Sequence, residues 1–190
     1  MDHPHRTVLV SHERLDGWCE RFGRRHGGYD RAVADGLVRL SAPDGAVAEF
    51  ADTSPPARFG LILVRRGGYA IGRIDDAHVV ASKCGTRYVQ GRTKAGGWSQ
   101  QRYARRRSNQ ADALAGAAGD AIRRVLAEAG AVVAYGGGDR RLVESAYEAA
   151  KVEGLTLAER WLDVPEPRRA TLDTAADQVR SVRIELNEHA

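Results

Sequence analysis

One segment of the 190-residue sequence combines residue types and spacing that could do chemistry. It runs through two glycines and two glutamines, Gly96-Gly97-Trp98-Ser99-Gln100-Gln101. Paired glycines allow backbone angles and close approaches that other residues cannot make. The tip contains no His, Cys, Asp or Glu, which excludes ordinary acid/base catalysis and metal binding there. The two glutamines instead supply amides, which both donate and accept hydrogen bonds.

Positive charge is concentrated around this segment. The net charge of the chain is +4, yet no acidic residue lies between Asp76 and Asp112. Eight cations lie in that interval: Lys83, Arg87, Arg92, Lys94, Arg102, Arg105, Arg106 and Arg107. Because these eight exceed the net charge, the remainder of the chain is mildly acidic. Such one-sided charge favours contact with a polyanion over a merely solvated surface.

The surrounding pattern predicts strands first and then helices alternating with strands. We expect strands at 7–10, 36–40, 46–50, 59–64, 69–74, 78–82 and 87–92, the later ones forming a meander. Helices are expected after Ser11, as N-cap, up to Gly27, from the glycine segment to Gly130, and after Asp139. Short strands at 132–135, 161–162 and 181–186 complete a mixed α/β sheet with helices packed on it, with a short helix around Leu172.

The segment resembles the catalytic loop of the central domain of eukaryotic and archaeal class I release factors. Those factors carry Gly-Gly-Gln-Ser and then an Arg-aromatic-Ala-Arg helix start. This chain has Gly96-Gly97-Trp98-Ser99 and then Arg102-Tyr103-Ala104-Arg105 in ungapped register. Trp98 replaces their glutamine, and in this departure the chain is similar to the Vms-type release factors. These are peptidyl-tRNA hydrolases of ribosome quality control with a bacterial branch, and they place the glutamine next to the serine.

The resemblance covers roughly residues 35 to 187 and implies an RNase H-like fold, a mixed sheet flanked by helices. It divides the chain into an N-terminal strand and helix extension, residues 1–34, and a release factor-like catalytic domain, residues 35–190. It implies Gln100 as the catalytic residue with Gln101 second, and Gly96 and Gly97 as the residues that admit the loop. The RNA-binding residues would be Arg92, Lys94, Trp98, Ser99, Arg102, Arg105, Arg106 and Arg107.

The implied activity is codon-independent hydrolysis of the ester bond of peptidyl-tRNA, through a GGxSQ loop inserted in the peptidyl transferase centre. The ester is an activated acyl group held in RNA, so a placed water and an oxyanion donor can suffice. The partners would be the ribosomal large subunit, peptidyl-tRNA and ribosomal RNA. No cofactor, metal or membrane is implied. Without a signal peptide or a span, and with two unrelated cysteines, Cys19 and Cys84, a cytoplasmic location is expected.

Three other interpretations of the same residues remain open. The site could cut the tRNA near its 3′ end, or the chain could bind the ribosome without catalysis. Asp75-Asp76 could also indicate a metal-dependent nuclease, although adjacent strand residues point to opposite faces and a turn is favoured.

Gly136-Gly137-Gly138 lacks the residues of a P-loop, so we expect a strand-to-helix turn capped by Asp139. His12, His26 and His78 are interpreted as surface or structural residues, and Trp18 and Phe22 as core residues.

Overall fold

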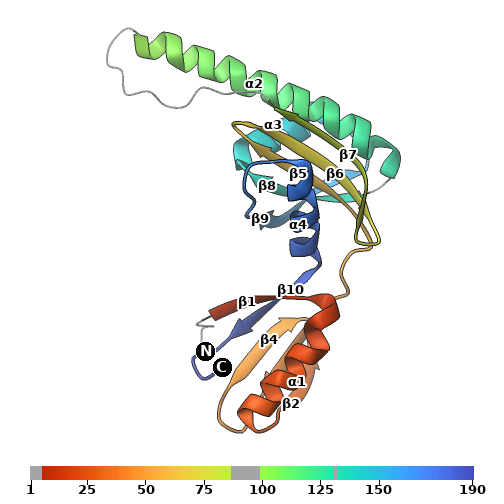
Figure 1. Cartoon of the computed structure of the whole chain (residues 1–190), viewed down its shortest axis with the longest axis vertical. Coiled ribbons are helices and arrows are strands. Elements are labelled where there is room, and N and C mark those ends of the chain that lie inside the picture. The colour runs from red at the N-terminus through yellow and green to blue at the C-terminus, as the bar shows by residue number, and fades with distance from the viewer. Residues whose placement is uncertain (1–5, 87–98, 131) are drawn as a thin grey trace. The chain divides into compact units, whose positions relative to one another are not determined.

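The computed structural model describes residues 6–86, 99–130 and 132–190, with side chains described outside 99–107. The chain forms two compact units (Figure 1). The first comprises the residues up to 56 together with those from 177 onward, and the second comprises residues 57–176. The expected boundary between residues 34 and 35 falls inside a hairpin of the first unit. The chain therefore leaves that unit after residue 56 and returns to it at residue 177.

The first unit is an antiparallel sheet with one helix. Its strands lie in the order β1-β10-β4-β3-β2. Their bounds are β1 Arg6–Ser11, β2 Asp30–Ala34, β3 Leu37–Ser41, β4 Val47–Ala51 and β10 Ser181–Leu186. Helix α1 (Leu15–His26) packs Phe22 into a core whose fully buried side chains come from three of the strands and from the turn before β4: Val38, Leu40, Ala46, Ala48 and Ile184.

The C-terminal end of α1 matches the sequence prediction, whereas its N-terminal end does not. Gly27 ends the helix in the left-handed conformation, with φ of 78°, and its N–H donates to the Gly23 carbonyl. This confirms the predicted glycine stop. Ser11 instead precedes a short 3₁₀ helix, η1 (His12–Arg14), and its side chain makes no capping hydrogen bond. The predicted N-cap was therefore wrong, because the 3₁₀ turn delays the start of α1 to Leu15.

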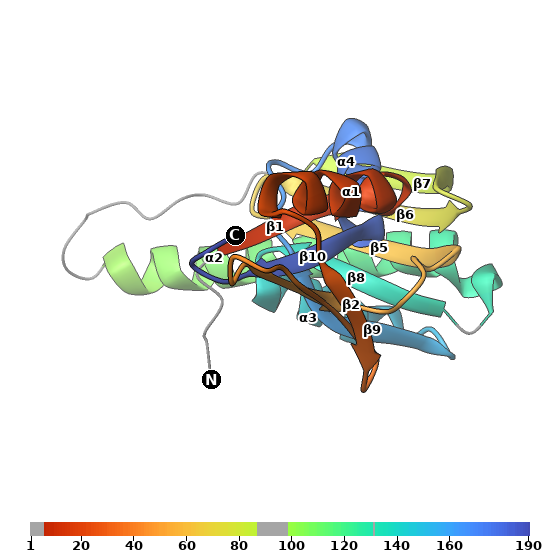
Figure 2. The same cartoon turned by 90° about the horizontal axis from the view of Figure 1, so that it is seen from below.

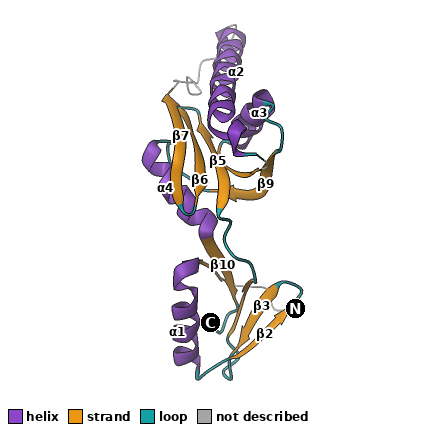
Figure 3. Ribbon diagram, turned by 90° about the vertical axis from the view of Figure 1, so that its right-hand side faces the viewer, coloured by secondary structure: helices purple, strands orange, loops and turns teal. Residues whose placement is uncertain are grey.

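The second unit is a mixed sheet with helices on both faces (Figure 3). The strand order is β7-β6-β5-β8-β9; β5, β8 and β9 are parallel and β6 is antiparallel to its neighbours. The strands are β5 Arg58–Arg65, β6 Gly68–Asp75, β7 His78–Thr86, β8 Val132–Gly138 and β9 Leu155–Leu162. The helices are α2 Ser99–Leu126, η2 Ala127–Ala129, α3 Arg140–Ala150 and α4 Arg169–Arg180, of which residues 177–180 belong to the first unit. This is the predicted RNase H-like arrangement, a mixed sheet flanked by helices.

The core of the second unit explains why β5 is an uninterrupted apolar run. Alternate residues of a strand point to opposite faces, yet Leu61, Ile62, Leu63 and Val64 are all fully buried. Ile62 and Val64 belong to the cluster that α2 and α3 cover. On the opposite face Leu172 of α4 lies against Gly72, where an added Cβ would be 3.1 Å from Leu172 Cδ2. A strand covered on both faces is expected to be continuously hydrophobic.

Two groups of predicted strands lie in a different sheet from the one expected. The strands at 36–40 and 46–50 were predicted as part of the one mixed sheet, and 181–186 as its last strand. They form β3, β4 and β10 of the first unit instead, where Ile184 pairs with Phe50. Apolar alternation predicts a strand but not its partner, which explains the difference. Strand β2 was not predicted because all five of its residues are exposed.

Candidate functional site

The residues predicted to do chemistry lie where β7 ends and α2 begins. Arg92, Lys94, Gly96, Gly97 and Trp98 lie outside the described residues, as does the strand predicted at 87–92. The other predicted residues belong to the first turns of α2, whose backbone is described: Ser99, Gln100, Gln101, Arg102, Arg105, Arg106 and Arg107. The roles of their side chains therefore stay predictions. The structure describes the elements on either side of the segment, β7 and α2.

Helix α2 projects beyond the sheet at its N-terminal end (Figures 1 and 2). Among its described side chains, the first buried one is Leu114, and Ser108 to Ala113 are exposed or half-buried. Beyond Leu114 the helix is anchored, because Ala118, Ile122 and Leu126 are buried against the sheet and α3. A helix rises about 1.5 Å per residue, so the residues before Leu114 carry the start of α2 about 20 Å past its anchored part.

The strand that leads into the segment ends at a defined edge of the sheet. Thr86 of β7 pairs with Gly68 of β6, which in turn pairs with Arg65 of β5. The strands approach so closely there that a Cβ on Gly68 would lie 2.4 Å from the Gly85 carbonyl oxygen. The pair Gly67-Gly68 is thus needed for more than a turn. It lets β7 end beside the start of β6, one strand away from the end of β5.

The same edge of the sheet carries arginines that the sequence analysis did not single out. Val64 pairs with Gly138, so the ends of β5 and β8 are adjacent, and each is followed by arginines. Arg65 lies 3.9 Å from an Asp163 carboxylate oxygen, whereas Arg66 and Arg141 are exposed and have no ion pair among the described residues. The signal in the sequence is a pair of arginines next to a glycine turn, Arg65-Arg66 and Arg140-Arg141.

The turn after β8 confirms the strand-to-helix prediction. Asp139 caps α3, since its Oδ1 accepts a hydrogen bond of 3.3 Å from the Leu142 N–H. Gly138 has φ of 95°, and an added Cβ would lie 2.3 Å from the Val64 carbonyl oxygen. Trp161 covers this turn, and its indole carries the Arg140 guanidinium 4.3 Å from the ring centroid. These contacts fix one arginine over an aromatic face.

The adjacent carboxylates Asp75 and Asp76 lie at the opposite edge of the sheet. Asp75 accepts a hydrogen bond of 2.8 Å from Arg58 Nε, and Asp76 has φ of 45° in the turn before β7. This is the turn that the sequence analysis favoured. Within residues 6–86, 99–130 and 132–190, no three His, Cys, Asp or Glu side chains gather as metal ligands. Over the same residues no helix is long and apolar enough to cross a membrane.

The two cysteines are half-buried free thiols, and burial raises the pKa of both Cys19 and Cys84. His26 is buried and joined to Asp44, which confirms its structural interpretation. Phe22 is buried as predicted, whereas Trp18 is half-buried at the edge of the first core. Of these residues, only Cys84 belongs to the second unit, where it lies in β7 near the end of the strand.

The second unit is thus an α/β domain with a mixed sheet, a projecting helix and exposed arginines after the ends of β5 and β8. A sequence family described as "Actinobacteria/chloroflexi VLRF1 release factor" matches residues 57–185, and the chain belongs to this family. The matched region contains the whole second unit and leaves residues 1–56 outside. The prediction of a Vms-type release factor family is therefore confirmed.

A solved structure titled "Crystal structure of archaeal translation termination factor, aRF1" is also similar to this chain. The similarity has a TM-score of 0.42 and 14% sequence identity, over 74% of this chain and 51% of that one. The chain thus spans about half the length of the archaeal factor. No curated protein matches the chain.

Proposed function

We propose that this chain is a codon-independent peptidyl-tRNA hydrolase that releases nascent peptides from stalled ribosomes or free large subunits. Its role would be ribosome rescue and quality control in the cytoplasm. The observation that carries the proposal is that Ser99-Gln100-Gln101, which follow Gly96-Gly97-Trp98 in the sequence, begin the projecting helix α2 in a member of a release factor family. A helix start that lies beyond its own sheet suits insertion into a narrow, RNA-walled site.

The chemistry requires a positioned water and a donor for developing negative charge. Water attacks the carbonyl carbon of the ester, and the bond from this carbon to the ribose oxygen breaks. The products are a peptide with a free carboxyl group and a tRNA with a free hydroxyl. The amide of Gln100, with Gln101 as second candidate, would orient the water or donate to the oxyanion. Gly96 and Gly97 would allow the close approach to RNA.

Electrostatics favours RNA at the same end of α2. The first turn of α2 contains no acidic residue, and Arg102, Arg105, Arg106 and Arg107 follow within the next turns. The N-terminal end of a helix is already the positive end of its dipole, so these cations are unfavourable there until an anion binds. Phosphates of tRNA and ribosomal RNA supply such an anion. Arg66 and Arg141 add exposed positive charge at the end of the sheet where β7 also ends.

The direct test measures peptide release from purified peptidyl-tRNA–ribosome complexes. Gln100→Ala, Gln101→Ala and the double variant are compared with the wild type, and Asn109→Ala removes an exposed amide from the same helix as a matched control. Loss of a preorganised hydrogen-bond donor typically costs about 100-fold or more in rate. We expect such a loss for at least one glutamine variant and none for Asn109→Ala. Full release by both single variants and by the double variant would refute the assignment.

The same reaction distinguishes the other activities. Mapping the tRNA 3′ terminus separates ester hydrolysis, which leaves the end intact, from nuclease action, which shortens it. Loss of activity with a chelator on free peptidyl-tRNA, without ribosomes, would identify a metal nuclease. Salt-sensitive binding without any turnover would identify a ribosome-binding factor. Each of these three results contradicts the proposed hydrolysis.

A further inference from the structure

The first unit contains a pocket that the release reaction does not use. It has a volume of about 320 Å³ and lies between α1, β1 and the end of β10. Six of its lining residues are aromatic or cationic: Arg6, Trp18, Arg21, Phe22, Arg25 and His26. The volume falls within the range of small-molecule sites, roughly 300 to 1,000 Å³. Residues 1–56, which supply all six, lie outside the region matched by the release factor family.

The floor of the pocket consists of three aromatic rings on one face of α1. Trp18, Phe22 and His26 recur every four residues, which places them on the same side of the helix. The ring centroids of Trp18 and Phe22 are 5.6 Å apart with the planes 21° from parallel, and those of Phe22 and His26 are 4.7 Å apart. Phe22 and His26 are buried, whereas Trp18 is half-buried and keeps part of its surface accessible.

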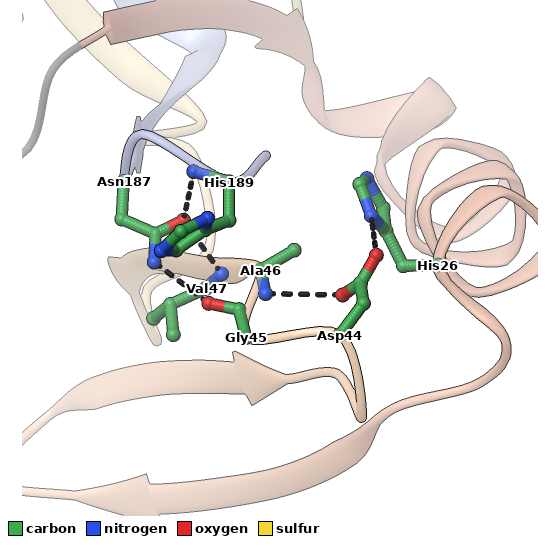
Figure 4. Close-up of polar contacts among 7 residues, drawn as sticks. All are labelled: His26, Asp44, Gly45, Ala46, Val47, Asn187 and His189. Carbon is green, nitrogen blue, oxygen red and sulfur yellow. Dashed lines mark hydrogen bonds and ion pairs between the residues drawn. The ribbon is translucent and has the colours of Figure 1, made fainter.

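His26 is held in place from outside the pocket. Its Nδ1 lies 2.8 Å from Asp44 Oδ2, and the other carboxylate oxygen of Asp44 accepts from the Ala46 N–H at 3.1 Å (Figure 4). Asp44 does not line the pocket. Both oxygens of this carboxylate are engaged, one with His26 and the other with a backbone N–H.

Exposed positive charge surrounds this aromatic floor. Arg6, Arg21 and Arg25 are exposed, and no ion pair joins any of them to a described residue. No Asp or Glu side chain belongs to the lining. Arginine binds phosphate through a planar pair of donors, and an accessible indole face stacks on a nucleobase. The combination matches a nucleotide, with its phosphate toward the arginines and its base toward Trp18.

The lining also indicates that binding would not depend on the identity of the base. Apart from the arginines and rings it is apolar, with Leu186 and Ala190, and it has no hydroxyl, amide or carboxylate side chain to read a base edge. Stacking and phosphate contact without base reading are typical of sequence-independent binding of single strands. We infer that this pocket binds one nucleotide of single-stranded RNA. The site is separate from the hydrolytic segment and does not depend on the proposed function.

The test measures binding of the full chain, without ribosomes, to a labelled single-stranded oligoribonucleotide by fluorescence anisotropy. Arg21→Ala/Arg25→Ala removes two lining charges, and Arg24→Ala removes an exposed charge from the same helix outside the pocket. Trp18→Leu removes the stacking face, while Trp18→Tyr keeps an aromatic ring there. We expect about tenfold weaker binding for Trp18→Leu and for the double variant. Trp18→Tyr and Arg24→Ala should bind within about twofold of the wild type.

Two further measurements make the result decisive. A 4-thiouridine oligonucleotide should crosslink to the α1 peptide that contains Trp18, and circular dichroism should show that the variants keep their helix content. Pocket variants that bind like Arg24→Ala, with no crosslink on α1, would overturn the inference. Equal affinity for a free mononucleotide would also overturn it, in favour of a metabolite site. The assay contains no peptidyl-tRNA and measures binding rather than release, so failure of the hydrolase proposal leaves this result unaffected.

Discussion

His26 and Asp44 connect the last turn of α1 to the β3–β4 turn through a contact of 2.8 Å between Nδ1 and Oδ2 (Figure 4). An ionised carboxylate can only accept, so the histidine Nδ1 donates. This hydrogen bond, together with the one from the Ala46 N–H, lowers the pKa of Asp44 below its ordinary value. The helix of the first unit is thus tied to its sheet by a contact that requires the ionised form of Asp44.

We predict that Asp44→Asn lowers the thermal midpoint of the first unit at pH 7. A carboxyl whose pKa is lower in the folded state stabilises the fold above its unfolded pKa, about 3.9, and this contribution is lost as the pH falls through the lowered value. The difference between the variant and the wild type should therefore shrink below about pH 4. Calorimetry from pH 3 to 7 measures it, with Asp52→Asn as a control for an exposed aspartate. A difference independent of pH would contradict this account.

Gly136 is predicted to tolerate no side chain. An added Cβ would lie 2.4 Å from Trp161 Cζ3, so Gly136→Ala must displace the indole that covers the β8–α3 turn. Overpacking of this kind costs about 1–3 kcal/mol of unfolding free energy, measurable by urea denaturation. Gly116→Ala is the control, because that position on α2 faces open space and alanine should stabilise the helix by about 0.5–1 kcal/mol. Trp161→Phe added to Gly136→Ala should recover part of the loss, whereas full stability of Gly136→Ala alone would show that the indole moves freely.

The cap of α3 gives a prediction with a closely matched control. Asp139→Ala removes the acceptor for the Leu142 N–H and should destabilise the second unit by about 1 kcal/mol. Asp139→Asn keeps a capping oxygen and should stay within a few tenths of a kcal/mol of the wild type. Urea unfolding of the three proteins measures both differences. Equal destabilisation by Asn and Ala would mean that the charge of Asp139, and not its cap, is what matters.

The exposed arginines that follow β5 and β8, Arg66 and Arg141, are predicted to bind ribosomal RNA. Arg66→Ala/Arg141→Ala should weaken binding to large subunits, and the slope of log K against log salt should fall by about 1 for each phosphate that the variant no longer neutralises. Arg124→Ala is the matched control, because it removes an exposed cation from the opposite end of α2. Equally weakened binding in the two proteins would indicate a diffuse charge effect.

The parts of the fold that local pattern determines were predictable. The apolar run of β5 followed by Gly67-Gly68 predicted the hairpin with β6, and Gly138-Asp139 predicted the start of α3. Strand β10 was predicted with its observed bounds, Ser181–Leu186, but in the wrong sheet, because pairing depends on contacts between distant residues. The arginines at the ends of β5 and β8 were missed for the same reason. Only the parallel pairing of Val64 with Gly138 brings them together.

Strand β10 lies inside the first sheet, between β1 and β4, although it comes from the far end of the sequence. Val8 pairs with Ile184, so this sheet cannot be completed until the whole second unit has been synthesised. Domains generally fold as units during synthesis. The second unit should therefore reach its native state first, while β1 and β4 keep unpaired backbone groups. A nascent copy whose own translation halts before β10 would expose two bare strand edges, which are prone to pair with other chains.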